Sequence, residues 1–69
     1  MSKISIQLNG KQEELDLGTT VRHVLENKGI NPNVVACELN LKIVKRALLG
    51  ETVLNQGDTL EVIQMIGGG

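Results

Sequence analysis

The 69-residue sequence contains no phenylalanine, tryptophan or tyrosine. It therefore offers no aromatic platform on which single-stranded nucleic acid could stack its bases. Seven basic and eight acidic residues give a formal charge of −1, and the lysines and arginines are scattered along the chain. Without a basic stripe to neutralise phosphates, the chain is not expected to bind nucleic acid.

Cysteine and histidine occur once each, as Cys37 and His23. One cysteine cannot form an internal disulfide, whereas small domains in oxidising compartments usually carry several cysteines. One cysteine and one histidine also fall short of the four nitrogen or sulfur ligands of a structural zinc site. We therefore expect a reduced, cytoplasmic protein without a bound metal.

Long apolar runs are absent as well, since none approaches the roughly 20 residues of a membrane span. Residues 1–3 lead directly into an alternating pattern, without the apolar core of a signal peptide. Leu, Ile and Val nevertheless make up about a third of the chain, well above the level of disordered proteins. A single small domain with an aliphatic core is expected, without membrane association.

A β-hairpin is predicted at the start of the chain. Apolar residues alternate over 4–8, which is typical of a half-buried strand. Asn9-Gly10 follows, and this dipeptide favours a type I′ turn because both central residues of such a turn need positive φ. The returning strand is expected over 11–17, with Leu15 and Leu17 on one face.

One helix is predicted, over Thr20–Lys28. Thr19 or Thr20 can cap its start, and Gly29 can end it in the left-handed conformation. Four residues at helical spacing share one face of this helix, which is expected to pack against a sheet: Val21, Val24, Leu25 and Lys28.

The second half of the chain predicts strands at 34–39, 42–44 and 59–66, and one helical turn at 45–49. The strand at 34–39 is β-branched and apolar, which is typical of a central strand. Its buried face is expected to carry Val35, Cys37 and Leu39.

This order of elements predicts an α+β fold of the β-grasp, or ubiquitin-like, class. A lone helix must bury its apolar stripe on a sheet, so we expect a mixed sheet of four to five strands with one main helix across one face. The first and last strands would lie parallel in the middle. A ferredoxin-like fold is the alternative, but it needs a second full helix, and 45–49 is too short.

Residues 1–66 are expected to form the β-grasp domain, and 67–69 a flexible glycine tail. The expected core comprises the residues on the apolar phase of each element: Ile4, Ile6, Leu15, Val21, Val24, Leu25, Val35, Cys37, Leu39, Leu60 and Val62.

Few side chains inside the domain could carry chemistry. His23 lies away from the apolar stripe of the helix and is expected to be an ordinary surface residue. Cys37 is expected to be buried and inert, because reactive thiols need an accessible, electropositive setting. The carboxylates of Glu13, Glu14 and Asp16 are typical of a solvated strand edge. No nucleophile is paired with a base, so an enzyme is not expected.

Three glycines follow the last predicted strand. Folding does not require them, and a frayed terminus or a cloning scar would account for them. The functional alternative is that three extended residues, reaching about 10 Å, thread a narrow channel that excludes side chains. They would then carry the ionised α-carboxylate of Gly69 into the active site of another protein.

Several segments carry a resemblance that covers nearly the whole chain: Ile4–Gly10, Thr20-Val21, Val35–Asn40, Ile43-Val44, the run Gly57–Ile66 and the terminal Gly68-Gly69. Together they resemble the ThiS family, the sulfur carriers of thiamine biosynthesis. The chain departs from the family pattern at Asn40-Leu41, where Asn-Gly is common, and at Lys45-Arg46, where Pro-Arg is common.

The resemblance implies a carrier rather than an enzyme. A separate, E1-like adenylating enzyme would use ATP and Mg²⁺ to convert the Gly69 carboxylate to an acyl-adenylate, and a persulfide donor protein would convert this to a thiocarboxylate. Gly67 and Gly68 would provide reach, and thiazole synthase would receive the sulfur. The chain itself is expected to bind no cofactor and to be a monomer when free.

Two other functions stay open at this point. A sister carrier of molybdopterin or cysteine synthesis, or a ubiquitin-like modifier, would share the fold and tail and differ in the acceptor. A plain β-grasp interaction module with an incidental glycine tail is the other alternative.

The partner-binding surface is expected at Ile63 and Met65, on the sheet face opposite the helix. Leu60 and Val62 point towards the helix, so these two residues alternate to the other side, where no second layer buries them. A satellite cluster with 53–54, or a bulge that reverses the register, is the alternative.

Overall fold

The computed structural model describes residues 2–65. The predicted glycine tail at 67–69 and Ile66, the last residue of the predicted final strand, lie outside the described residues. In chain order the elements are β1 (Lys3–Leu8), β2 (Lys11–Asp16), α1 (Val21–Asn27), the 3₁₀ turn η1 (Pro32–Val34), β3 (Val35–Leu39), β4 (Lys42–Val44), the 3₁₀ turn η2 (Arg46–Leu48) and β5 (Thr59–Gln64). None of the helical segments within residues 2–65 has the length and apolarity that crossing a bilayer requires.

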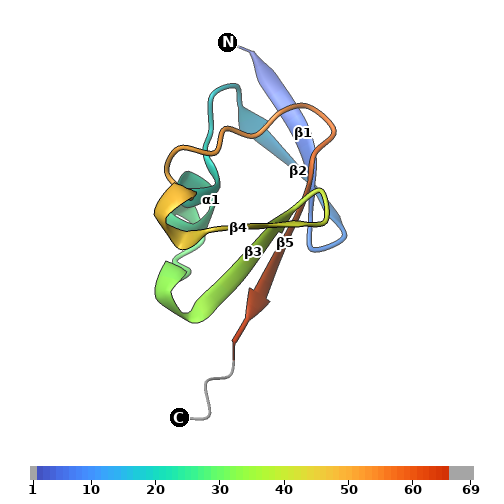
Figure 1. Ribbon diagram of the computed structural model, residues 1–69. Helices are drawn as coiled ribbons and strands as arrows, with labels where there is room; N and C mark the ends of the chain where they lie inside the picture. Colours follow the sequence, from blue (N-terminus) through green and yellow to red (C-terminus); the bar gives the residue numbers. More distant parts are fainter. Residues whose placement is uncertain (1, 66–69) are drawn as a thin grey trace.

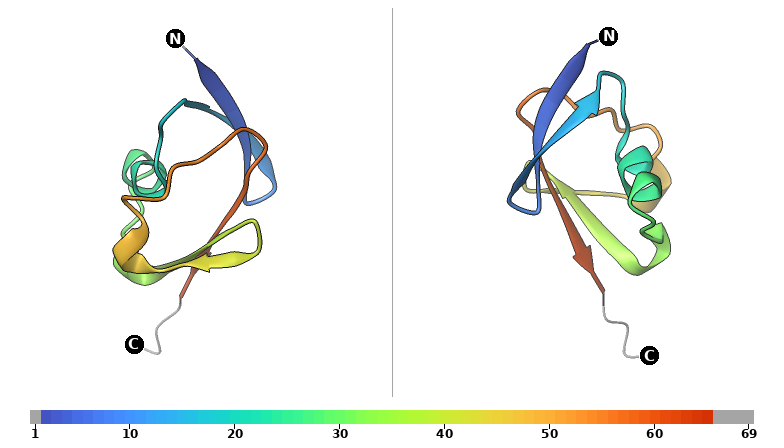
Figure 2. Two further views of the ribbon diagram at one scale, coloured as in Figure 1. Left: turned by 45° about the horizontal axis from the view of Figure 1, so that its top comes forward. Right: turned by 180° about the vertical axis from the view of Figure 1, so that it is seen from behind.

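The five strands form one sheet in the order β2-β1-β5-β3-β4. β1 and β5 run parallel, and all other neighbours run antiparallel. Figures 1 and 2 show α1 and η2 together on one side of the twisted sheet, while no described element covers the other side. This confirms the β-grasp fold, with β5 at the centre of the sheet and one main helix.

The first hairpin forms as predicted, with φ of 50° at Asn9 and 83° at Gly10. The expectation for Leu17 is wrong, because β2 ends at Asp16, opposite Lys3. Leu17 lies beyond the last strand pair and its side chain is 62% exposed. The backbone turns away from the sheet at Gly18, which has a φ of 96°.

Helix α1 is bounded by the predicted caps. The Thr20 hydroxyl accepts a hydrogen bond from the His23 N–H at 3.2 Å, and the first helical N–H groups donate to the carbonyls of Thr52 and Leu49. At the other end Gly29 has a φ of 69°. The N–H groups of the first helical turn, residues 21–24, are therefore all paired.

The start of β3 differs from the prediction by one residue. Pro32 begins the 3₁₀ turn η1, and the Asn31 side chain caps this turn by accepting from the Asn33 N–H at 2.9 Å. Val34 therefore belongs to the turn and is exposed, and the strand begins at Val35. Proline fixes its own φ near −65°, which favours the turn over an extended start.

The core fills the space between the sheet and α1. The predicted core residues are buried, except that Leu15, Leu39 and Val62 are only partly buried against it. Leu8, Leu49 and Leu54 are also buried. The last two lie in the irregular segment after β4, which backbone hydrogen bonds attach to the start of α1.

Leu25 provides the test of this packing, because its side chain is completely buried. We expect Leu25→Ala to lower the free energy of unfolding by about 2–4 kcal/mol, from lost burial and an unfilled cavity. Chemical denaturation measures this change, with Leu17→Ala as the exposed control that stays within about 0.5 kcal/mol. An unchanged denaturation midpoint for Leu25→Ala would contradict the position of α1 on the sheet.

Candidate functional site

The face of the sheet opposite α1 carries exposed apolar side chains on β5, β3 and β4. Ile63 lies opposite Ala36, and Ile43 lies opposite Glu38. Residues opposite each other in an antiparallel pair share a face, and the side chains of Ile63 and Ile43 are 47% and 72% exposed. These side chains form an exposed apolar patch on the open side of the sheet, which also carries the carboxylates of Glu38 and Glu61.

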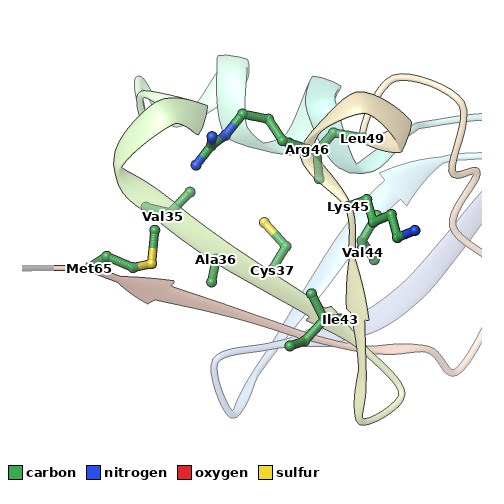
Figure 3. Close-up of a pocket in the computed structure, with 9 residues that line it drawn as sticks. All are labelled: Val35, Ala36, Cys37, Ile43, Val44, Lys45, Arg46, Leu49 and Met65. Carbon is green, nitrogen blue, oxygen red and sulfur yellow. The ribbon is translucent and has the colours of Figure 1, made fainter.

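A groove of about 280 Å³ adjoins this face at the start of β3. Figure 3 shows its wall, formed by Val35, Ala36 and Cys37 of β3, by residues of β4 and η2, and by Met65 after the end of β5. Ala36 pairs with Ile63 and also lines the groove with Met65. The groove and the apolar face are thus joined through Ala36 into one surface.

Arg46 and Lys45 give this groove a basic rim. The Arg46 guanidinium donates to the Pro32 and Asn33 carbonyls, at 3.2 and 3.4 Å, and so joins η2 to the loop before β3. Within residues 2–65, neither Lys45 nor Arg46 forms an ion pair with a carboxylate. The surface therefore combines apolar side chains with basic groups at the groove and carboxylates on the open face.

β5 is held along its length up to the point where the groove begins. Asn40 Oδ1 accepts from the Thr59 N–H at 2.9 Å, and Asn9 Oδ1 accepts from the Val62 N–H at 2.8 Å. The Met65 N–H donates to the Val34 carbonyl at 2.8 Å. The backbone is thus held in place as far as Met65.

The sequence analysis did not identify the role of these two asparagines. Asn40 also donates from Nδ2 to Asp58 Oδ1 at 3.0 Å, so its side chain joins the β3–β4 turn to the start of β5. The available signal was an asparagine at the first central position of each hairpin turn. Asparagine tolerates positive φ and can use its side chain to bond a neighbouring backbone.

The predicted binding residues Ile63 and Met65 are both exposed, at 47% each. Ile63 lies on the open face beside Ala36, whereas Met65 lines the groove together with Val35 and Cys37. The predicted reacting residue Gly69 and the preceding Gly67 and Gly68 lie outside the described residues.

The two residues with the most reactive side chains do not combine into a catalytic site. His23 is exposed on α1, and Cys37 is buried, with 2% of its surface exposed. Burial raises the pKa of the Cys37 thiol above its ordinary value, because the charged thiolate is poorly solvated there. No group of three histidine, cysteine or carboxylate side chains within the described range could hold a metal ion.

Comparison with known proteins gives consistent results. The ThiS family model matches residues 6–69. A crystal structure of the thiamine biosynthesis protein ThiS from Geobacter metallireducens superposes with a TM-score of 0.82 at 26% identity, covering 96% of this chain and 100% of that one.

The sequence relatives fall into two kinds. A thiazole synthase from Magnetococcus marinus is 39% identical over 66 residues, which are 96% of this chain and 20% of the relative. A thiazole synthase from Paramagnetospirillum magneticum is 33% identical over 66 residues, which are 20% of that relative. The chain thus spans about a fifth of the length of both thiazole synthases. An uncharacterized protein from Pyropia yezoensis is 38% identical, with 99% of this chain and 96% of the relative covered.

The burial of Cys37 predicts that its thiol reacts slowly although it borders the groove. Because burial raises its pKa, a smaller fraction of the Cys37 thiol is ionised at a given pH than of an exposed cysteine, whose pKa is about 8.5. We expect iodoacetamide at pH 8 to modify the folded protein at least about tenfold more slowly than the urea-unfolded protein. Mass spectrometry over time measures both rates, and equal rates would show that the groove exposes the sulfur.

Proposed function

The chain is a member of the ThiS family, and from this premise we propose that it carries sulfur as a thiocarboxylate on Gly69 for thiazole formation in thiamine biosynthesis. Family membership and the structural similarity to a thiamine biosynthesis protein support a sulfur-carrier role in this pathway. Small carriers of this type are not catalysts themselves. The observation that supports this function most directly is that the family match continues through the last three glycines to residue 69.

The chemistry takes place on the terminal carboxylate, which is a poor electrophile until it is activated. An E1-like adenylating enzyme transfers AMP from Mg²⁺-bound ATP to the Gly69 carboxylate and releases pyrophosphate. The outer sulfur of a donor persulfide then displaces AMP, and a thiol reduces the resulting acyl disulfide to the thiocarboxylate. Thiazole synthase is the proposed acceptor of this sulfur.

The contribution of this chain is to present the tail and to bind the partner. Three extended glycines reach about 10 Å beyond the domain, and the absence of side chains suits a narrow channel. The Met65 N–H is bonded to the Val34 carbonyl of the turn before β3, so the position of the domain on its partner would set where the following glycines begin. Precise placement matters because even a 1 Å error in a reacting atom can cost about 100-fold in rate.

The proposed docking surface consists of Ile63, Ala36, Ile43 and Met65. These side chains form the open apolar face and the adjoining wall of the groove. Exposed apolar patches of this kind mark interaction sites on soluble domains, and this one lies beside the strand end from which the tail leaves. The adenylating enzyme is its proposed partner.

Changes at the terminus test the proposed chemistry. Deleting Gly69 shortens the reach by about 3.3–3.6 Å, and adding one residue after Gly69 converts the reacting carboxyl to an amide. We expect both variants to lose thiocarboxylate formation by about 100-fold or more, measured as replacement of one oxygen by sulfur in the intact mass. His23→Ala and Cys37→Ala are the matched controls, and both should be loaded normally. Normal loading of the Gly69 deletion would contradict the role of the terminus.

Met65→Glu tests the docking surface separately from the tail. A carboxylate at the rim of an apolar groove loses its hydration when the partner binds, so we expect affinity for the adenylating enzyme to fall by about tenfold or more. Titration calorimetry measures the affinity, and circular dichroism confirms that the variant is folded. Leu17→Glu is the control, because Leu17 is also apolar and exposed but lies just beyond the end of β2. Equal affinities for both variants would place the interface elsewhere.

A further inference from the structure

The turn between β3 and β4 holds a leucine in a conformation that disfavours it. Asn40 and Leu41 have φ values of 52° and 72°, so both lie in the left-handed region. That region brings Cβ of an L-residue close to the backbone and costs free energy for any residue but glycine. Asn40 compensates through its two side-chain hydrogen bonds to Thr59 and Asp58. Leu41 has no comparable compensation, because its side chain is 86% exposed.

The first hairpin of the same molecule shows that the fold does not need this leucine. Its turn has positive φ at Asn9 and Gly10, and the Asn9 side chain caps β5 just as the Asn40 side chain does. The two turns therefore share their conformation and their asparagine, and differ in having glycine or leucine at the second central position. Glycine would relieve the strain in the β3–β4 turn and keep its hydrogen bonds.

The neighbours of Leu41 indicate what it could contact. Leu41 and Ile43 have the largest exposed fractions among the large apolar side chains of residues 2–65. Lys42 lies between them in the sequence, and Lys45 follows β4; neither lysine forms an ion pair within that range, although Glu38 lies opposite Ile43. An apolar pocket edged by carboxylates complements this combination of an exposed leucine and unpaired positive charge.

The position of Leu41 in the fold separates it from the tail. Leu39 pairs with Leu60 at the start of β5, whereas Val35 pairs with Gln64 at its end. The turn thus lies at the start of β5 (Figure 1), roughly 13 Å of strand from Gln64, whereas the glycines follow the other end of β5 in the sequence. All partners of a carrier must handle the same tail, so a contact that distinguishes between them has to lie away from it.

We propose that Leu41 is a specificity anchor that inserts into an apolar, carboxylate-edged pocket on thiazole synthase. This inference rests on the proposed function, because it requires thiazole synthase to be the sulfur acceptor. Thiazole synthase is chosen over the adenylating enzyme because two relatives of that name contain a segment matching this chain within their own sequence. The strain at Leu41 is then retained because the side chain serves binding and not folding.

Two substitutions at Leu41 separate the side chain from the strain. Leu41→Ala removes the side chain and keeps most of the strain, whereas Leu41→Gly removes both. We expect both variants to bind thiazole synthase from the same organism about tenfold more weakly. We also expect Leu41→Gly to melt about 4–8 °C above Leu41→Ala, since glycine adopts this φ freely. Leu17→Ala, at an exposed leucine with negative φ, is the control and should keep wild-type affinity.

The contribution of the positive charge near Leu41 is tested with a second matched pair of variants. Lys42→Glu should weaken binding to thiazole synthase by about tenfold and make it less dependent on salt. Lys11→Glu makes the same change at the opposite edge of the sheet, on β2, and should leave the affinity unchanged. Titration calorimetry with unloaded carrier measures all affinities, and intact-mass loading by the adenylating enzyme is followed for every variant.

The outcomes distinguish this inference from the proposed function. Normal loading of the Leu41 variants together with weak binding to thiazole synthase supports the anchor. Three outcomes overturn the anchor. They are wild-type affinity of both Leu41 variants for thiazole synthase, an equal loss of their affinity for the adenylating enzyme, and no binding of the wild-type carrier to thiazole synthase. Failure of the wild-type chain to form a thiocarboxylate overturns the proposed function instead, whatever the effect of Leu41 on binding.

Discussion

The backbone hydrogen bonds on the two edges of β5 are the interactions on which the rest of the structure depends. β1 pairs with its start and β3 with its whole length. The side chains of Asn9 and Asn40 add a bond each from the neighbouring turns. β5 therefore connects the two hairpins into one sheet and fixes the backbone as far as Met65. The proposed function requires this, because a partner that binds the domain would use it as the reference for positioning the terminal glycines.

The two sides of the sheet have separate tasks. One side is buried against α1 and η2, and the first N–H groups of α1 bond the segment after β4, so that even the irregular part of the chain contributes Leu49 and Leu54 to the core. The other side is left open, with apolar side chains at Ile43 and Ile63. The residues that stabilise the fold are thus different from those of the proposed docking surface.

Much of the fold followed from the sequence because the signals were local. Alternating apolar residues, Asn9-Gly10 and the helix caps are each decided within a few residues, and they fixed the β-grasp order of elements. The burial of Leu49 and Leu54 could not be predicted, because that segment has no periodic pattern and its burial depends on hydrogen bonds to a distant helix. The groove was also missed, since it forms only where β3, η2 and Met65 meet in space.

The proposed site was predictable only in part. Ile63 and Met65 followed from strand alternation, whereas the chemistry assigned to Gly69 rests on family resemblance and not on geometry. Fragmentation mass spectrometry of the intact chain tests that assignment most directly, after incubation with the adenylating enzyme, ATP, Mg²⁺ and a persulfide donor. A terminal fragment containing Gly69 should carry sulfur in place of one oxygen, while fragments containing Cys37 keep their mass. Sulfur found on Cys37, or no exchange at the terminus, would contradict the carrier function.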